Sequence, residues 1–266
     1  MNKIDSIKKY KIDKKRKQIF ILFSQISIFA LLISLWETLS NFNIINSFIF
    51  SSPSKIINLF ISYLNSGELI THIYISTYEA TISLLISLFL GIGIATLLYL
   101  NQTLSKILDP YLILINALPK SALAPILIIW LGANKQGIIG VSISFVMIII
   151  IINTLISFKQ VDQDLIVLLK SMNASKLQIL FKVVFPYNLV NLFSLLKVGI
   201  GLSWVGVIVG EFLSSKSGIG YLIMYGGQVF KLDLVMMGII VLSFIAYFMY
   251  GIVVILEKIV KKKYHF

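Results

Sequence analysis

Residues 160–186 read QVDQDLIVLLKSMNASKLQILFKVVFP, a polar stretch between two strongly apolar parts of the chain. Residues 136–158 before it carry no charged side chain, and the chain becomes apolar again after Pro186. The stretch is too long and too regularly patterned for a plain turn, and it predicts two short helices joined at residues 172–175. We expect this hairpin to be presented between two apolar spans as a contact surface for a binding partner.

The first predicted helix has clear start and stop signals. Asp162 and Asp164 stand at its beginning, where negative charge offsets the positive end of the helix dipole. Lys170 stands in the last turn, where a cation is favourable. Helical spacing also predicts one apolar face, made of Leu165, Leu168, Leu169 and Met172.

The second helix is preceded by a sharp turn. Asn173 tolerates the left-handed conformation that ends helices. Ser175 followed by Gln178 predicts a capping box, and Pro186 predicts a helix boundary before the next apolar run. Spacing alone leaves two equal alternatives, an amphipathic hairpin lying on the lipid surface and a docking element for a partner protein.

Composition places the chain in a membrane. Of its 266 residues 58% are hydrophobic and 13% are charged, and the mean hydropathy is +0.95. A soluble domain has about 25% charged residues, so the apolar surplus must face lipid or other spans. The net charge of +12 is concentrated at the chain ends and in the hairpin, which argues against nucleic acid binding. There is no cysteine, and the two histidines lack ligand spacing, so no metal site is expected.

Six segments are long and apolar enough to cross a bilayer as helices. They are about 19–39, 79–100, 110–131, 137–158, 187–212 and 234–256. Because the apolar runs are continuous instead of alternating, they favour helices over barrel strands. The first run is longer than a signal-peptide core and lacks a cleavage site, so we interpret it as an uncleaved span.

The Lys and Arg residues indicate the orientation of these spans. With the N-terminus inside, the inner segments hold eight in residues 1–18, one at 106, four in 159–182 and four in 258–263. The outer loops hold four, Lys55, Lys135, Lys216 and Lys231. We therefore expect both termini and residues 160–186 to face the cytosol. Small residues four apart, in 91–95 and 206–210, predict close helix packing, within one subunit or at a dimer seam.

The hairpin resembles the cytosolic signature loop of ABC importer permeases, roughly Glu-Ala-Ala, three residues, Gly, nine residues and Ile-x-Leu-Pro. Pro186 takes the proline position, and Asn173 takes the glycine position thirteen residues earlier. Val167 stands where the family has Glu, so a polar contact of that acid is absent here. Asn in place of Gly is a mild change because both accept positive φ.

Shorter motifs extend the resemblance over about 36–258, towards the nitrate/sulfonate/taurine branch, which includes importers of thiamine precursors. In family order they are SSPSKI (51–56), GELI (67–70), LDP (108–110), LP (118–119), PILIIWLG (125–132), NT (153–154), AS (174–175), GEF (210–212) and GIGYLI (218–223). The resemblance implies an all-α, type I importer permease with six spans in the plasma (inner) membrane.

The family mechanism implies several partners. Two permease copies, expected here as a homodimer, form the pathway. A cytosolic ABC ATPase dimer binds the ATP and grips the hairpin, and an extracytoplasmic solute-binding protein delivers a small anionic or vitamin-precursor solute. The permease itself is neither an enzyme nor a holder of cofactors, and it lies in membrane lipid. The residues expected to couple to the ATPase are Leu169, Lys170, Met172, Asn173, Ala174, Ser175, Lys176 and Pro186.

We expect the domain plan to be a basic cytosolic tail (1–18), a first span with its outer loop (19–70), the permease domain (71–257) and a second basic tail (258–266). Candidates for the solute pathway are Pro119, Lys120, Pro125, Lys197, Trp204 and Glu211. The prolines predict a kinked or broken third span. Lys197 lies either about 15 Å deep, at 1.5 Å per residue, or at the cytosolic rim of a later-starting span.

Glu211 is expected to pair with Lys216 or a partner subunit, or only to mark the interface. A different class of function is a secondary carrier driven by an ion gradient. It is disfavoured because few intramembrane carboxylates are available and only one predicted span is broken. A scaffold or a membrane-embedded enzyme is a third class, but no His/Asp/Glu cluster supports an enzyme.

Overall fold

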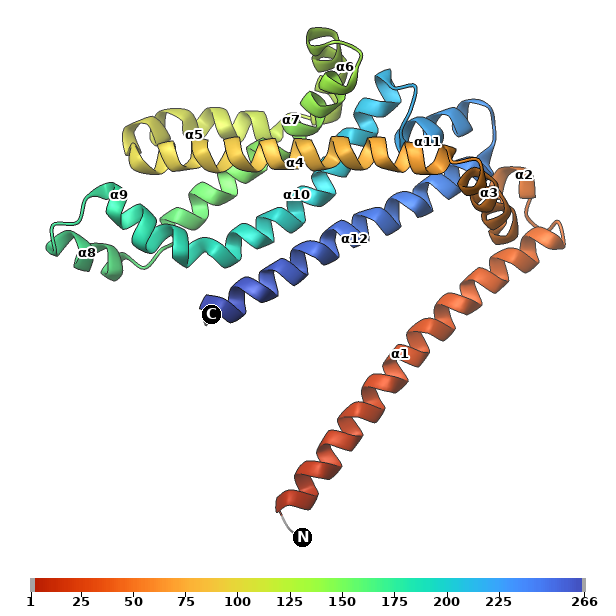
Figure 1. The fold of residues 1–266 in the computed structure, drawn as a ribbon, viewed down its shortest axis with the longest axis horizontal. Helices are drawn as coiled ribbons and strands as arrows, with labels where there is room; N and C mark the ends of the chain where they lie inside the picture. The colour runs from red at the N-terminus through yellow and green to blue at the C-terminus, as the bar shows by residue number, and fades with distance from the viewer. Residues whose placement is uncertain (1–2, 265–266) are drawn as a thin grey trace.

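The computed structural model describes residues 3–264, and all regular elements in that range are helices (Figure 1). They are α1 (Lys3–Asn41), α2 (Ser47–Phe50), α3 (Pro53–Asn65), α4 (Glu68–Leu100), α5 (Gln102–Ala117), α6 (Lys120–Leu131), α7 (Lys135–Lys159), α8 (Gln163–Ser171), α9 (Lys176–Ile179), η1 (Leu180–Val184), α10 (Phe185–Ser214), α11 (Ile219–Gln228) and α12 (Leu232–Tyr264). Five stretches are long and apolar enough to cross a membrane, in α1, α4, α7, α9–α10 and α12, or six if α5 and α6 form one bent span.

The core of the bundle is made by α4, α7 and α10, with α7 packed against both of the others. Three glycines let these backbones approach closely. A Cβ on Gly206 would lie 2.5 Å from Ser142 Cα, one on Gly210 would lie 3.0 Å from Ile138 Cα, and one on Gly91 would lie 2.7 Å from Ile150 Cγ2. The predicted small-residue packing is therefore confirmed within one chain, whereas a Cβ on Gly93 would meet open space.

Helix α1 stands apart from this bundle. In Figure 1 it leaves the corner formed by α2 and α3 and runs away from the other long helices. Its most apolar window, within 13–41, has no buried residue. At its end, Glu37 accepts hydrogen bonds from the Ser54 backbone N–H (3.0 Å) and hydroxyl (2.8 Å), and Ser40 donates to the Ser51 carbonyl (3.1 Å). The first span is thus attached near its C-terminal end, by these polar contacts and by Trp36, which packs against the core.

The break expected in the third predicted span, 110–131, is confirmed at Pro119, but the start of that segment differs from the expectation. Helices α5 and α6 meet at a bend of 97°, and α5 begins eight residues earlier than predicted, at Gln102. The break is at Leu118 and Pro119, both extended (ψ 136° and 100°). Proline disfavours helical conformation in the residue before it and has no N–H to donate, so the helix ends there. Pro125, also expected to interrupt the span, stays inside α6.

The boundary predicted at Pro186 is wrong. The chain runs from α9 through the π-helical turn η1 into α10 without a break. Pro186 lies in the first turn of α10, directly after that turn. A π-turn inserts an extra residue and shifts the hydrogen-bond register, which accommodates a ring that lacks a donor. Helices α1 and α12 likewise continue through most of the sequence expected as basic tails.

Candidate functional site

The helical hairpin between α7 and α10 has its own small core. Ile166 of α8, Ile179 of α9 and Leu180 of η1 are buried against Phe158 and Val184. Phe158 also makes edge-to-face contacts with Tyr99 (5.6 Å between ring centroids) and Phe185 (5.2 Å). These contacts fix the hairpin to the ends of α4 and α7, so it is a folded extension of the bundle.

The turn of the hairpin has the predicted local structure. Asn173 has φ 57°, the left-handed conformation expected of it. The Ser175 backbone N–H donates to the Gln178 side chain (2.8 Å), and the Gln178 backbone N–H donates to Ser175 Oγ (3.2 Å). Asp162 accepts a hydrogen bond from the Asp164 backbone N–H (2.9 Å) at the start of α8. The capping box, the start of α8 and the left-handed turn at Asn173 are confirmed.

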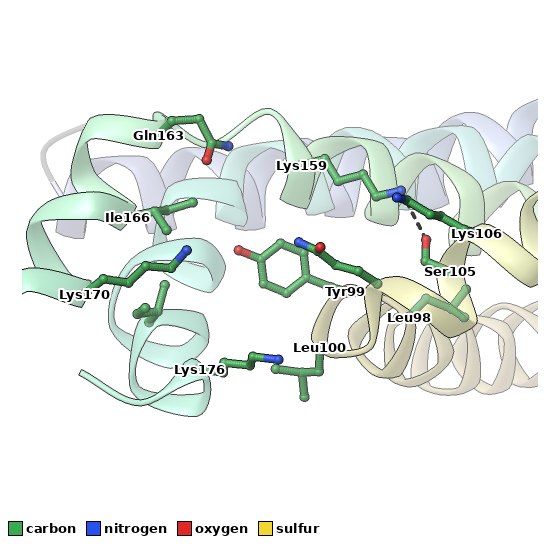
Figure 2. A pocket seen from close by; sticks show the side chains of 12 residues that line it. Leu98, Tyr99, Leu100, Ser105, Lys106, Lys159, Gln163, Ile166, Lys170 and Lys176 are labelled. Atoms are coloured by element: carbon green, nitrogen blue, oxygen red, sulfur yellow. Dashed lines mark hydrogen bonds between the residues drawn. The ribbon is translucent and has the colours of Figure 1, made fainter. Parts of the chain in front are cut away.

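One face of α8 is apolar and exposed. Leu165, Leu168 and Met172 are 40%, 57% and 70% exposed. Their predicted companion Leu169 turns inward, and like Ala174 it packs against the hairpin core. Lys170 and Lys176 instead line a pocket on the inner side of the hairpin (Figure 2). The residues expected to couple to the ATPase therefore divide between an outward apolar surface, the turn, and this inner pocket.

A second polar cluster lies at the opposite end of the bundle, around Glu211. This side chain is fully buried and accepts hydrogen bonds from Ser76 Oγ (2.5 Å) and from the Gly220 backbone N–H (2.5 Å). Ser76 in turn accepts from the Ile219 backbone N–H (2.7 Å). Glu211 makes these contacts instead of an ion pair with Lys216. It joins α4, α10 and the beginning of α11.

The turn before α11 depends on glycine. Gly218 has φ +108°, and its N–H donates to His72 Nδ1 (2.9 Å). Cβ atoms at Gly218 or Gly220 would overlap the Glu211 carboxylate. The GIGYLI motif thus acts as a close-fitting backbone cradle for one buried acid.

Glu79 of α4 lies in the same region and was not singled out from the sequence. It is fully buried, and neither of its side-chain oxygens has a hydrogen-bond donor. The charged side chains that act on its carboxyl group are Glu211 and Lys135. Its position inside a long apolar helix could have identified Glu79 from the sequence. It was missed because the second span was predicted to begin at residue 79, which placed this carboxyl group at the membrane boundary. The bundle thus holds two buried carboxyl groups close together.

Lys197 of α10 is paired with Glu257 of α12. Its Nζ lies 2.5 Å from Glu257 Oε2, and Glu257 Oε1 lies 2.9 Å from Lys261 Nζ. Glu257 directly precedes the basic run 258–263, so the pair lies near the end of α12. Sequence reasoning missed Glu257, although its spacing of four from Lys261 is a usual helical pairing.

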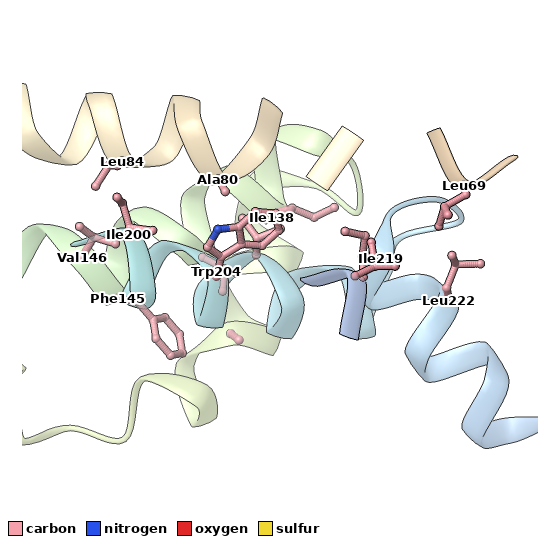
Figure 3. Close-up of a cluster of buried hydrophobic side chains, with 14 of the residues drawn as sticks. Leu69, Ala80, Leu84, Ile138, Phe145, Val146, Ile200, Trp204, Ile219 and Leu222 are labelled. Carbon is pink, nitrogen blue, oxygen red and sulfur yellow. The ribbon is translucent and has the colours of Figure 1, made fainter. Parts of the chain in front are cut away.

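Of the remaining pathway candidates, Pro119, Lys120 and Pro125 lie together at α6, and Trp204 lies in α10. Lys120 begins α6 and donates to the Asn116 carbonyl (3.3 Å) at the end of α5. Pro119 and Pro125 are exposed. Trp204 belongs to the same core cluster as Ala80 and Ile138 (Figure 3). Among residues 13–263, no group of His, Cys, Asp and Glu side chains could hold a metal ion.

The family described as binding-protein-dependent transport system inner membrane component matches residues 84–262. The chain belongs to this family. A protein of Bacillus subtilis named as an aliphatic sulfonates transport permease, SsuC, is 28% identical over 86% of this chain and 83% of its own length. The taurine transport system permease TauC of Escherichia coli is 24% identical over 82% and 81%.

Among solved structures, the MetNI methionine ABC transporter in an inward-facing conformation is similar in fold. Its matching chain has a TM-score of 0.64 and 14% identity, and the match covers 73% of this chain and 96% of that one. The all-α importer-permease fold expected from the sequence is confirmed. The chain is a permease subunit of an ATP-driven importer and a multi-pass inner-membrane protein, a transport component and not an enzyme. The alternative of a secondary carrier is not supported.

Proposed function

We propose that the helical hairpin, residues 160–186, is the surface through which a cytosolic ATPase dimer drives this permease. The observation that carries the proposal is the exposed apolar face of Leu165, Leu168 and Met172. Exposed apolar surface on a charged, folded projection is typical of a protein contact. The hairpin core and the continuous helix from α9 into α10 connect α8 rigidly to the bundle. A displacement of α8 by the ATPase is therefore transmitted to the spans.

The proposal includes the arrangement around this contact. Both termini and the hairpin face the cytosol, because positive residues are concentrated there. A second copy of the chain completes the pathway, and its contributors include the α5–α6 bend at Pro119, with Lys120 and Pro125, and the charged pair at Lys197. An extracytoplasmic binding protein delivers the solute near α3 and α11, at the Glu211 end. Trp204 acts on the pathway through packing.

The solute class is proposed from the relatives. The relatives include permeases named for aliphatic sulfonates, taurine, nitrate and formylaminopyrimidine. We propose a small anion of the sulfonate or nitrate kind, with a thiamine precursor as the second candidate because of the formylaminopyrimidine permease. A thermal-shift screen of these solutes against the solute-binding protein that works with this permease distinguishes the two.

The docking role is tested with the double substitution Leu168→Asp and Met172→Asp. Two charges on the exposed face are expected to abolish co-purification of the ATPase, since they desolvate poorly in an apolar contact. Val167→Asp is the matched control. Val167 is also exposed (61%) but lies about 100° from Leu168 and about 140° from Met172 around the helix axis. Undiminished ATPase binding by the double variant, with normal membrane insertion, would contradict the proposal.

A further inference from the structure

A pocket of about 410 Å³ lies where the hairpin meets the ends of α4, α5 and α7. Four lysines line it, Lys106, Lys159, Lys170 and Lys176. In Figure 2 Lys106 and Lys159 enter from one side and Lys170 and Lys176 from the other, with Tyr99 between the two pairs. These lysines come from four different helices, so the folded hairpin is what brings them together.

None of these four lysines forms a salt bridge with another side chain of residues 13–263. Among residues 13–263, the two salt bridges both involve Glu257, far along the chain from this site. Lys159 donates a hydrogen bond to the buried hydroxyl of Ser105 (3.2 Å). That contact holds one ammonium in place and leaves its charge unpaired. Four close cations without a counter-ion repel each other, so an anion bound here would be stabilised.

Other groups in the pocket favour an anion that carries oxygen atoms. Gln102 and Ser105 belong to the first turn of α5. The N-terminus of a helix carries partial positive charge and unsatisfied N–H groups, and it is a frequent phosphate site. The Tyr99 ring also lines the pocket, and Figure 2 shows its hydroxyl directed towards Lys170. The site thus combines charge with neutral donors at one position.

The surroundings of the pocket are those of a membrane boundary. Helix α4 ends at Leu100 and α7 ends at Lys159, where the apolar spans finish. Leu98, Leu100, Ile166 and Ile179 form an apolar lining. Beside it Leu97 and Ile107 are 62% and 57% exposed, as expected of side chains in contact with acyl chains. A ligand with a phosphate next to hydrocarbon matches both halves of this environment.

We propose that this pocket binds the phosphate-bearing headgroup of an anionic phospholipid. Basic pockets on the cytosolic side of membrane proteins are suited to such headgroups. The location at the base of the hairpin makes the bound lipid part of the hairpin's support, joining α8 and α9 to α5 and α7. The placement in the cytosolic leaflet rests on the orientation proposed above, whereas binding itself does not.

Native mass spectrometry of the full-length chain in detergent, titrated with phosphatidylglycerol, tests the proposal. Wild type is expected to bind it in preference to phosphatidylcholine. Each lysine near an anionic lipid contributes about 1 kcal/mol, so Lys106→Gln with Lys170→Gln should weaken binding about 30-fold. Replacing the same two lysines with Arg should preserve binding, which separates loss of charge from misfolding.

The matched control is Lys182→Gln with Lys258→Gln, which removes the same charge from exposed positions outside the pocket. If this control changes the affinity for phosphatidylglycerol little, a specific site in the pocket is supported. If it weakens binding as much as the pocket variant does, the proposal is overturned and the lipid is held by unspecific charge attraction. Inorganic phosphate is added as a competitor. If it displaces phosphatidylglycerol with an affinity equal to that of the lipid, the pocket is a site for free phosphate and the lipid assignment is overturned. Normal lipid binding but lost ATPase binding in the pocket variant also overturns it, in favour of an acidic protein partner.

Discussion

At the scale of single residues, the buried acids are the least expected feature. Glu211 has two strong donors, but Glu79 beside it has none. A second buried carboxyl group that has no donor of its own is unfavourable in an apolar bundle. Glu79→Gln keeps the shape of the side chain and removes one titrating group, so thermal unfolding in detergent should occur at an equal or higher temperature.

Ser76→Ala, by contrast, should lower the free energy of unfolding by about 1–3 kcal/mol, because it removes the Ser76 hydroxyl that bonds both Glu211 and the Ile219 N–H.

The unfolding temperatures of Glu79→Gln and Ser76→Ala are to be compared with each other. Both alter the same buried cluster, and neither changes the volume of the core much. If Glu79→Gln lowered the unfolding temperature as far as Ser76→Ala, the Glu79 carboxyl group would be needed for stability, and the view that it is unfavourable beside Glu211 would be wrong.

At the scale of helices, contact between α7 and α10 depends on glycine. An added methyl at Gly206 would meet the Ser142 backbone at 2.5 Å, so the two helices would have to separate. We expect Gly206→Ala to destabilise by about 1–3 kcal/mol, measured by thermal or denaturant unfolding in detergent. A Cβ added to Gly201 of the same helix would have no atom within 4 Å, so Gly201→Ala should be neutral or stabilising. Equal destabilisation by both would mean that backbone freedom, and not packing, is what α10 needs.

At the scale of the whole molecule, orientation decides which face meets the ATPase. The chain has no cysteine, so single cysteines can be introduced at Asn173 in the hairpin and at Lys216 in the loop after α10, both exposed. A membrane-impermeant thiol reagent applied to intact cells should label Lys216→Cys alone, and Asn173→Cys should react only after the membrane is opened. The reverse pattern would invert the proposed topology and remove the hairpin from the cytosol.

Much of this architecture could be predicted because its causes are local. A bilayer demands long apolar helices, so the spans in α4, α7, α10 and α12 follow from hydropathy. The hairpin turn follows from Asn173 and the Ser175–Gln178 capping box, which act within a few residues of each other. Pro119 was correctly expected to interrupt a helix, although the size of the bend was not.

The sequence by itself thus determined a helical membrane protein with a capped hairpin and a family resemblance that the comparisons confirmed. The tertiary structure decided which residues share a site. It paired Lys197 with Glu257, placed Glu79 beside Glu211, turned Leu168 and Met172 outward, and gathered four lysines around one pocket. It also carried the helix through Pro186 by a π-turn. These outcomes depend on contacts between segments distant in the chain, whose energies are set by packing geometry that no local pattern contains.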